Sequence, residues 1–213
     1  MAPGARAVVF DLDGTLVDSA PDITRALNTA LAAQSLPPVT ADQVRGLLGE
    51  GARALVGRAL ALAGGSEAGV DTALADYTTA YTADPVAETT LYADAGDAVA
   101  ELHAHGVRIG VCTNKRSALA HRVLHHTGLA GAVDAVVGID EVSAGKPDPE
   151  HLRTAFDRLE VPPSESLYVG DTAIDAETAK RVGVDYVHVA WGHVGEHTVI
   201  ERFHELFERI RPA

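Results

Sequence analysis

Short apolar runs recur along the chain at intervals typical of strands separated by helices. Five of these runs predict buried strands, at residues 7–10, 107–112, 135–138, 166–170 and 186–191. Apolar residues at helical spacing predict four helices around them, at residues 94–106, 116–128, 150–159 and 173–182. Three of these helices close on a glycine, which commonly ends a helix. Strands that alternate with helices predict a parallel sheet covered on both faces.

The long stretch between the first strand and the helix near residue 95 shows only helical periodicity. One face of its first segment collects apolar residues, namely Ile23, Ala26, Leu27, Ala30 and Leu31. Ser19 and Asp22 precede that face at capping-box spacing, with Asp where Glu is usual, and Thr40 and Gln43 repeat the spacing before a second helix. Two further helical patterns follow, at residues 51–64 and 70–81.

These patterns predict an α/β protein with a Rossmann-like parallel sheet core and an inserted all-helical cap domain. We place the core at residues 1–16 and 89–213 and the cap at residues 17–88. The last segment carries apolar residues at helical spacing, at Ile200, Phe203, Leu206, Phe207 and Ile210. We expect this segment to be a helix packed on the sheet, and an exposed stripe for dimerisation is the alternative.

Composition narrows the classes of partner. Thirty acidic against 17 basic residues give the 213-residue chain a formal charge of −13, which disfavours nucleic acid and anionic membranes as partners. Cys112 is the single cysteine, so no internal disulfide can form and a reducing compartment fits. The first residues show no signal-peptide pattern, and no apolar run is long enough to span a membrane. We therefore expect a soluble, cytoplasmic monomer or homodimer.

The first strand runs directly into two aspartates, Asp11 and Asp13. Ligands of open parallel sheets bind beyond the carboxyl ends of the strands. Residues i and i+2 of an extended chain point to the same side, so both carboxylates can face one small volume. Two like charges so close require a cation between them or a proton on one of them. The pair therefore suits Mg²⁺ binding or general acid catalysis.

Polar groups also follow the ends of other predicted strands. Thr113 and Asn114 come after the second strand, Lys146 lies in a loop with two prolines, and Asp171 and Asp175 come after the fourth strand. Each has an ordinary structural explanation, such as a solvated loop lysine or a helix cap. Their joint occurrence at strand ends instead indicates a site that binds an anion.

The order of these motifs, DLDGT, TN, GKPDP and GDTAID, resembles that of the haloacid dehalogenase superfamily of phosphatases and phosphotransferases. The similarity extends over essentially the whole chain. The segments FDLDGTLVDSAPDI and VCTNK look especially like its phosphoglycolate phosphatase branch, and a helical insert after the first motif is similar to its first cap class.

The resemblance implies a Mg²⁺-dependent phosphatase of a small phosphorylated metabolite. It implies that Asp11 attacks phosphorus and becomes an aspartyl-phosphate, while Asp13 acts as general acid and base. Mg²⁺ would be held by the Asp11 carboxylate, the Asp13 main-chain carbonyl and Asp171, with Asp175 in support through water. The remaining implied residues, which neutralise the transferring group, are Thr113, the backbone around Asn114, and Lys146.

Other chemistries of the superfamily remain as alternatives. A dehalogenase needs no acid at the second aspartate, and a phosphonoacetaldehyde hydrolase needs a cap lysine that this chain lacks. A sugar phosphomutase shares all four motifs, but its cap usually offers lysine and arginine for a second phosphate. This cap offers arginines alone, at Arg25, Arg45, Arg53 and Arg58. A pyrophosphatase, a nucleotidase and an inactive binding module also stay open.

The cap loop LLGEGARAL is expected to contact the substrate. Gly49 and Gly51 let the backbone approach a ligand, and Arg53 either meets a substrate carboxylate or lies on the surface. His121 and His125 stand at i, i+4, a spacing that can bind zinc, but a solvated helix face is the expected alternative. Cys112 is expected to point away from Thr113 into the core.

Overall fold

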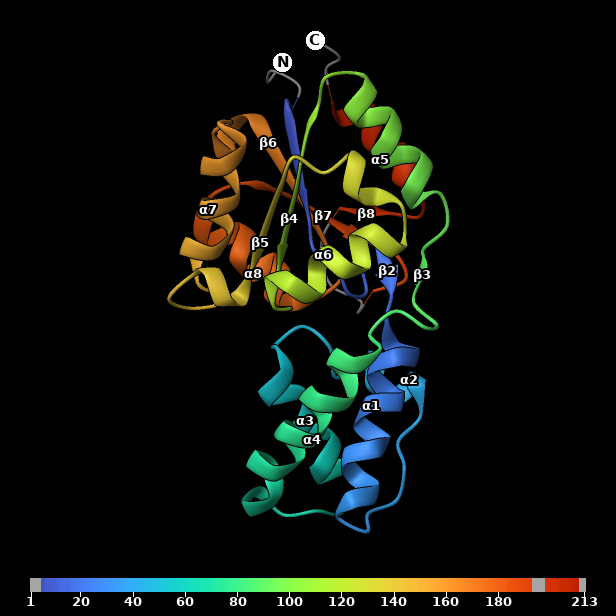
Figure 1. Cartoon of the computed structure of the whole chain (residues 1–213). Coiled ribbons are helices and arrows are strands. Elements are labelled where there is room, and N and C mark those ends of the chain that lie inside the picture. The colour runs from blue at the N-terminus through green and yellow to red at the C-terminus, as the bar shows by residue number, and fades with distance from the viewer. Residues whose placement is uncertain (1–4, 193–197, 211–213) are drawn as a thin grey trace.

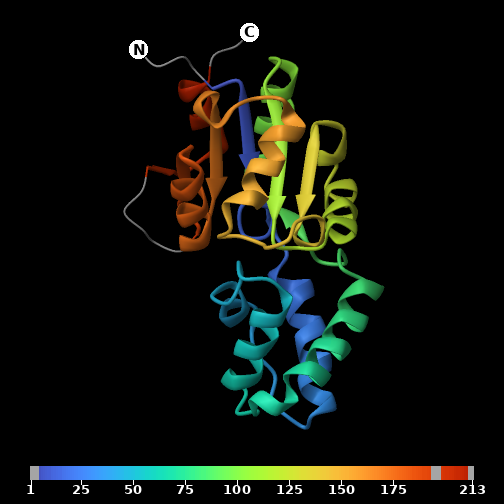
Figure 2. The same cartoon turned by 90° about the vertical axis from the view of Figure 1, so that its left-hand side faces the viewer.

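The computed structural model describes residues 5–192 and 198–210 of the chain. It confirms the predicted parallel sheet, whose strand order is β5-β4-β1-β6-β7-β8 and whose neighbouring pairs are all parallel. The strands are β1 (Ala7–Phe10), β4 (Arg108–Thr113), β5 (Ala135–Gly138), β6 (Ser166–Gly170), β7 (Asp185–Val189) and β8 (Val199–Ile200). The strand arrows point toward a separate helical bundle, so the carboxyl ends of the strands face that bundle (Figure 2).

Helices cover both faces of the sheet (Figure 1). They are α5 (Ala95–Ala104), α6 (Ser117–His126), α7 (Pro149–Leu159) and α8 (Ala173–Val182). Alternate residues of β1 serve the two faces, because successive side chains of a strand point in opposite directions. Val8 and Phe10 pack with α5 and α6, whereas Ala7 and Val9 pack with α7 and α8.

The cap is a bundle beyond the carboxyl ends of the strands (Figure 1). Its helices are α1 (Ala20–Ala33), α2 (Ala41–Arg45), α3 (Ala52–Leu62) and α4 (Val70–Ala83). Their apolar side chains form a cluster of their own, which Leu119 of α6 joins from the core. The predicted α/β fold with a helical cap is therefore confirmed.

A short antiparallel ribbon connects the cap to the core. It pairs β2 (Val17–Asp18) with β3 (Thr90–Leu91). Buried Asp22 fastens the ribbon to the first cap helix, because its Oδ2 accepts hydrogen bonds from the backbone N–H groups of Glu88 and Thr89 at 3.0 and 2.8 Å. Hydrogen bonds to the charged group outweigh the effect of burial, so the pKa of Asp22 lies below its ordinary value.

One of the two predicted capping boxes is correct. Thr40 and Gln43 form a reciprocal capping box at the start of α2. The prediction for Ser19 is wrong, because the Ser19 side chain makes no capping hydrogen bond. The Ser19 hydroxyl instead donates to Asp13 Oδ1 at 2.6 Å, while Asp22 holds the ribbon. The spacing of Ser19 and Asp22 matches a capping box, but the charged Asp13 carboxylate accepts the hydrogen bond of the Ser19 hydroxyl.

The predicted C-terminal α-helix is also wrong. Ile200 belongs to β8, which adds to the sheet beside β7, and residues Phe203–Arg209 form the 3₁₀-helix η5. Phe203 and Leu206 are buried three residues apart, which matches the 3₁₀ repeat. Phe203 contacts Phe10 with ring centroids 5.9 Å apart, so the segment does pack on the sheet as expected.

The remaining short elements are 3₁₀-helices in loops, namely η1 (Glu67–Gly69), η2 (Leu129–Gly131), η3 (Ile139–Glu141) and η4 (Pro163–Glu165). Within the described residues, no helix has the length and apolar character needed to cross a membrane.

Candidate active site

Asp11 and Asp13 lie where β1 leaves the sheet. The Asp11 backbone N–H still donates to Val169 of β6 at 2.9 Å, so the strand geometry extends to this residue. Gly14 then turns the chain with φ +90°, a conformation that side chains disfavour. A Cβ at Gly14 would lie 2.3 Å from Asp171 Oδ2, so the turn also needs glycine to leave room for that carboxylate.

Lys146 forms a buried and fully engaged centre beside Asp11. Its ammonium lies 2.9 Å from Asp11 Oδ1 and 2.6 Å from Asp175 Oδ1, and it donates to the Tyr168 hydroxyl at 3.0 Å. Burial alone would lower the pKa of Lys146, but Asp11 and Asp175 raise it above its ordinary value. Lys146 therefore remains a cation at neutral pH.

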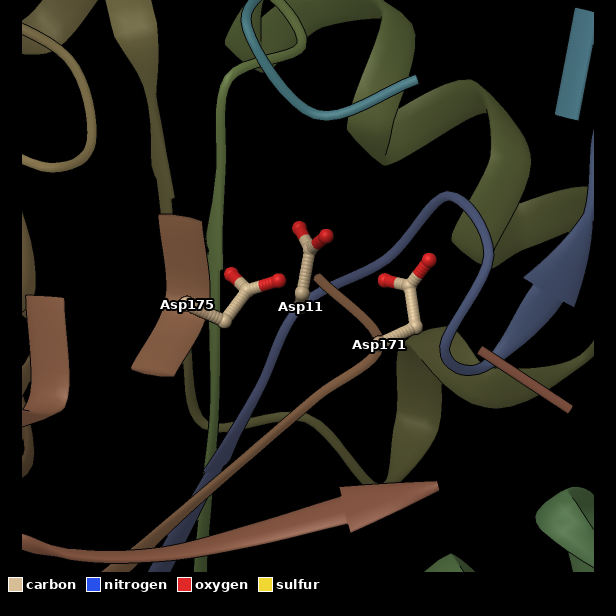
Figure 3. A group of neighbouring side chains, drawn as sticks. All are labelled: Asp11, Asp171 and Asp175. Carbon is tan, nitrogen blue, oxygen red and sulfur yellow. The ribbon is translucent and has the colours of Figure 1, made fainter. Parts of the chain in front are cut away.

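Three carboxylates gather at this edge of the sheet. One carboxylate oxygen from each of Asp11, Asp171 and Asp175 lies within 4.8 Å of the other two. Figure 3 shows Asp11 between the other two, and the three carboxylates point to the same side. Asp171 is held by the Thr15 hydroxyl, which donates to its Oδ1 at 2.9 Å.

Burial and mutual repulsion set the charges of this cluster. Burial raises the pKa of Asp11 to about 6, because Lys146 offsets only part of the effect and Asp175 and Asp13 add to it. Burial, Asp175 and Asp11 raise the pKa of Asp171 well above its ordinary value. A cluster of buried acidic oxygens that repel one another fits a hard divalent cation, which would favour the ionised forms.

Asp175 has a different environment from the other two. Its Oδ1 accepts from Lys146 and from the Tyr168 hydroxyl at 2.7 Å, and its Oδ2 accepts from the Thr172 hydroxyl and N–H at 2.6 and 3.1 Å. Burial would raise its pKa, but Lys146 and these hydrogen bonds lower it below the ordinary value. Asp175 thus acts as a carboxylate acceptor that fixes both Lys146 and the start of α8.

Asp13 meets a second buried lysine, Lys115. The Lys115 ammonium lies 2.7 and 2.8 Å from the two Asp13 oxygens, and Ser19 donates to Asp13 as well. The same ammonium lies 4.9 Å from the centre of the Tyr81 ring, a distance suited to a cation–π contact. Burial would lower the pKa of Lys115, but Asp13 and the tyrosines raise it above its ordinary value.

A cavity of about 140 Å³ opens between the cap and these residues. Its walls are mostly apolar, and its polar floor contains both aspartates of the first motif. The core contributes residues that include Asp11, Asp13, Thr113, Asn114, Lys115 and Leu119. The cap contributes residues that include Ile23, Leu48, Gly49, Leu55, Tyr77 and Tyr81. Ligand pockets of drug-sized molecules span about 300–1,000 Å³, so this cavity suits a small substrate.

Thr113 and Asn114 both line the cavity, but their side chains differ in what they leave available. Thr113 Oγ1 accepts a hydrogen bond from the Lys115 N–H at 3.2 Å, and no other hydrogen bond of this hydroxyl is found among the described residues. The Asn114 amide donates to the Gly49 and Lys146 carbonyls at 2.8 and 3.0 Å and accepts from the Lys146 N–H at 2.8 Å. Asn114 therefore joins the cap loop to the lysine loop, and its side chain is not free for a phosphate.

The cap loop reaches the site through its glycines. Gly49 has φ +110°, and a Cβ there would lie 3.3 Å from side-chain atoms of Thr172 and Ile174. Gly49 thus packs against the core beside the carboxylate cluster, as expected of a loop that closes over the site. Gly51 also lines the cavity and caps the start of α3.

Arg53 takes the second of the two positions that the sequence left open, because it lies on the surface and does not line the cavity. Its guanidinium pairs with Asp71 at 2.7 Å, and its side chain is 65% exposed. The other cap arginines pair with acids too: Arg25 with Asp22, Arg45 with Asp18, and Arg58 with Glu50. None of the four lines the cavity. A mutase would require cap cations that bind a second phosphate, and this cap presents no unpaired arginine for that purpose.

Two further expectations concern side chains outside the site. Cys112 is buried on the face of the sheet that packs against α7, opposite Thr113, as expected. His121 and His125 are exposed on α6. Within residues 5–192 and 198–210, no third ligand lies near enough to make them a metal-binding group.

Lys115 and Tyr81 were not identified as site residues from the sequence. Lys115 follows Thr113 by two positions, a spacing that could have placed it on the same side of the chain. Tyr77 and Tyr81 stand at i, i+4 on α4, and their rings stack with centroids 5.5 Å apart. That spacing shows only a shared helix face, and it does not reveal which core residue the face meets.

Comparisons with known proteins show the family of this chain. Residues 5–183 match the family model of haloacid dehalogenase-like hydrolases. A phosphoglycolate phosphatase of Rhodospirillum rubrum is 43% identical over 197 residues, which cover 90% of this chain and 82% of the relative. A phosphoglycolate phosphatase of Cereibacter sphaeroides is 37% identical over 213 residues, which cover 96% and 97%.

Solved structures share the same architecture. A protein from Lactobacillus delbrueckii subsp. bulgaricus superposes with a TM-score of 0.91 at 24% identity, covering 99% of this chain and 100% of that one. CbbY from Rhodobacter sphaeroides, solved in complex with phosphate, gives a TM-score of 0.75 at 23% identity, covering 95% and 96%. The fold, the site and the sequence relatives agree, and the chain therefore belongs to the haloacid dehalogenase-like hydrolases and is a phosphatase of that family.

Proposed function

We propose that this phosphatase hydrolyses a small phosphate monoester such as phosphoglycolate, through an aspartyl-phosphate on Asp11 and with Mg²⁺ as cofactor. The observation that carries the proposal is the position of the two aspartates. Asp11 is held by Lys146 among buried acids, Asp13 is held by Lys115, and both line one small cavity. The names of the sequence relatives support the same substrate.

Asp11 is suited to act as the nucleophile. An Asp11 oxygen attacks phosphorus, the P–O bond to the leaving group breaks, and an aspartyl-phosphate forms. Lys146, 2.9 Å from Asp11 Oδ1, neutralises charge on the phosphoryl oxygens, and Thr113 and the backbone around Asn114, which line the cavity, offer further donors.

Asp13 is suited to move the proton. It protonates the leaving alkoxide in the first step. In the second step it accepts a proton from the water that attacks phosphorus, while the bond between phosphorus and the Asp11 oxygen breaks and inorganic phosphate leaves. Ser19 and Lys115 fix its carboxylate from two sides, which keeps it aimed at the cavity. The fixed orientation of this carboxylate matters because a misplaced catalytic group contributes much less to the reaction rate.

The carboxylate cluster supports a Mg²⁺ site. The Asp11 carboxylate, the Asp13 main-chain carbonyl and Asp171 would hold the ion, and Asp175 would act through water, since its own oxygens already accept four hydrogen bonds. When bound, Mg²⁺ supplies charge that orients the transferring phosphoryl group and offsets its negative oxygens.

Release of inorganic phosphate from phosphoglycolate tests this proposal. We expect turnover with Mg²⁺, loss of turnover on complete chelation, and recovery when Mg²⁺ is restored. Glucose 1-phosphate with a catalytic amount of its bisphosphate distinguishes a mutase. Rapid formation of glucose 6-phosphate with little free phosphate would contradict water as the acceptor, and unchanged activity after chelation would contradict the metal. A cytoplasmic location and a monomeric or dimeric state stay predictions of the sequence.

A further inference from the structure

The Lys115 ammonium has one N–H donor more than its hydrogen bonds to Asp13 use. A lysine ammonium has three N–H donors. Within the described chain, the two oxygens of Asp13 are the acceptors that Lys115 Nζ reaches, and the Tyr81 ring covers another side. One donor of a cation that is 95% shielded along its side chain therefore remains for a ligand.

Tyr81 offers a second such group. Its side chain is 3% exposed, and burial raises the pKa of its hydroxyl although the nearby Lys115 ammonium offsets part of that effect. The hydroxyl still makes no hydrogen bond of good geometry among the described residues. A buried hydroxyl without a partner costs free energy, so it usually indicates a missing ligand or water. Both Lys115 and Tyr81 line the cavity, whose other walls are largely apolar.

The position of Lys115 relative to Asp13 specifies what it can reach. Asp13 meets the ester oxygen of the leaving group, and Lys115 lies 2.7–2.8 Å from the Asp13 oxygens. The ester oxygen and the Lys115 ammonium are thus both neighbours of one carboxylate. A negative group two bonds beyond the ester oxygen can contact the ammonium without leaving the small cavity.

We propose that Lys115 and Tyr81 form a subsite for a carboxylate at the end of the leaving group, and that this subsite selects short monoesters that carry one. The inference rests on the proposed phosphatase function and names the substrate class of the same site. The carboxylate accepts the free Lys115 donor and the Tyr81 hydroxyl, so two unsatisfied groups gain a partner together. Sugar and nucleotide esters lack an anion at this distance from the ester oxygen and exceed the cavity.

The subsite also connects recognition to closure of the cap. Tyr81 belongs to cap helix α4, whereas Lys115 follows core strand β4. Their contact, together with the hydrogen bond from Arg122 of α6 to the Thr82 carbonyl, exists only while the cap rests on the core. A carboxylate that bridges the two side chains therefore stabilises the closed, water-excluding state.

A matched pair of esters tests the subsite. Phosphoglycolate and 2-hydroxyethyl phosphate are close in size, but only the first ends in a carboxylate. The quantity measured is the ratio of their kcat/KM values, in the wild type, Lys115→Met and Tyr81→Phe. Lys180→Met, which removes an exposed lysine on α8, is the matched control. Taking the ratio cancels any common loss that arises because Lys115 also touches Asp13.

We expect the wild type to favour phosphoglycolate by about 100-fold or more, because a site built to bind a charged group discriminates against an analogue without it. Lys115→Met should remove most of this preference, Tyr81→Phe should reduce it by about five- to tenfold, and Lys180→Met should preserve it. Tyr81→Phe keeps the ring and the packing, so it provides the test even where Lys115→Met fails to fold.

Equal losses for both esters in Lys115→Met and an unchanged ratio in Tyr81→Phe would overturn the subsite while leaving the phosphatase intact. A wild type that hydrolyses both esters equally, or that prefers a larger neutral ester, would also overturn it. Failure to release phosphate from any ester would instead contradict the proposed function.

Discussion

Two buried lysines divide the site into regions of opposite character. Lys146 is surrounded by Asp11, Asp175 and the Tyr168 hydroxyl, and it has an acceptor in each direction. Among the described residues, Lys115 forms an ion pair only with Asp13 and lies against the ring of Tyr81, whose hydroxyl makes no hydrogen bond there. A fully satisfied network holds its members in one geometry, whereas an incompletely satisfied one can gain a ligand. The comparison supports the proposed roles, with Lys146 serving phosphoryl transfer and Lys115 serving recognition of the rest of the substrate.

The largest effect should follow from Asp11→Asn on the Lys146 side. The substitution removes the nucleophile but keeps the size and one acceptor of the side chain, so turnover should fall by about 10⁴-fold or more. The measurement is phosphate release, with circular dichroism to show that the fold persists. Near-normal turnover in a folded variant would remove Asp11 from its proposed role.

Lys146→Met should combine a catalytic and a structural loss. The variant leaves Asp11 and Asp175 buried without their cation, and breaking a buried ion pair in this way costs about 3–5 kcal/mol. We expect a lower free energy of unfolding in urea and a loss of activity of about 100-fold or more. Lys115→Met is the matched comparison, because Asp13 keeps Ser19 and borders a cavity. A larger stability loss in Lys115→Met than in Lys146→Met would reverse the division between the two lysines.

Asp171→Asn should stabilise the metal-free protein at neutral pH. The pKa values of Asp171 and Asp11 are raised above their ordinary value of 3.8, to about 6 for Asp11, so the folded state binds more protons than the unfolded state between about pH 4 and 6. The metal-free protein therefore loses stability as the pH rises through that window. Removing one charge at pH 7.5 should add on the order of 1–3 kcal/mol to the free energy of unfolding.

The same variant should lose the stabilisation that Mg²⁺ gives the wild type. Denaturation in urea at pH 7.5 and at pH 4.5, with chelator and with Mg²⁺, measures both effects. The gain from Asp171→Asn should shrink at the lower pH, because Asp11, whose pKa is about 6, is then largely protonated and the repulsion within the cluster is weaker. A variant that is destabilised at neutral pH without metal would show that the cluster carries no repulsion.

Mg²⁺ affinity should weaken as the pH falls. Protons compete for Asp11, whose pKa is about 6, and for Asp171, whose pKa is also raised. Between pH 7.5 and 5.5 the dissociation constant should rise at least about fourfold, and binding should release protons. Calorimetry in buffers of different ionisation enthalpy measures both quantities. Binding that is independent of pH, with no proton released, would contradict a site built on these carboxylates.

The smallest effect is expected at Arg53, which the sequence left open as either a specificity residue or a surface residue. Arg53 forms an exposed pair with Asp71, and exposed pairs contribute at most about 1 kcal/mol. Arg53→Ala should change kcat/KM by less than about twofold for both phosphoglycolate and 2-hydroxyethyl phosphate. A selective loss for phosphoglycolate would transfer the carboxylate-binding role from Lys115 to Arg53.

Strand ends were the part of the site that could be predicted from the sequence. Asp11, Asp13, Lys146 and Asp171 follow short apolar strands or a proline-bounded loop, and a parallel sheet brings such positions to one edge. Local chain geometry therefore predicts their meeting. The strands and α-helices of the core could also be predicted, because the spacing of their apolar residues is a local property of the sequence.

Contacts between separate parts of the chain could not be predicted in this way. The Ser19 hydroxyl donates to Asp13 and does not cap a helix, and the Asn114 amide donates to the Gly49 carbonyl. Arg53 forms an ion pair with Asp71. Each of these side chains had another plausible role, and its partner depends on how the folded chain brings separate segments together. Tyr81 belongs to the same group, because its place in the site depends on how the cap rests on the core.

Chemical trapping at Asp11 tests the central claim most directly. The wild type is mixed with phosphoglycolate and Mg²⁺, quenched in acid during turnover, reduced with borohydride and digested for mass spectrometry. Borohydride reduces an acyl phosphate to an alcohol, so we predict homoserine at position 11 in the quenched enzyme, and none without substrate or in Asp11→Asn. Release of phosphate with unmodified Asp11, or with the modification at another acid, would contradict the account.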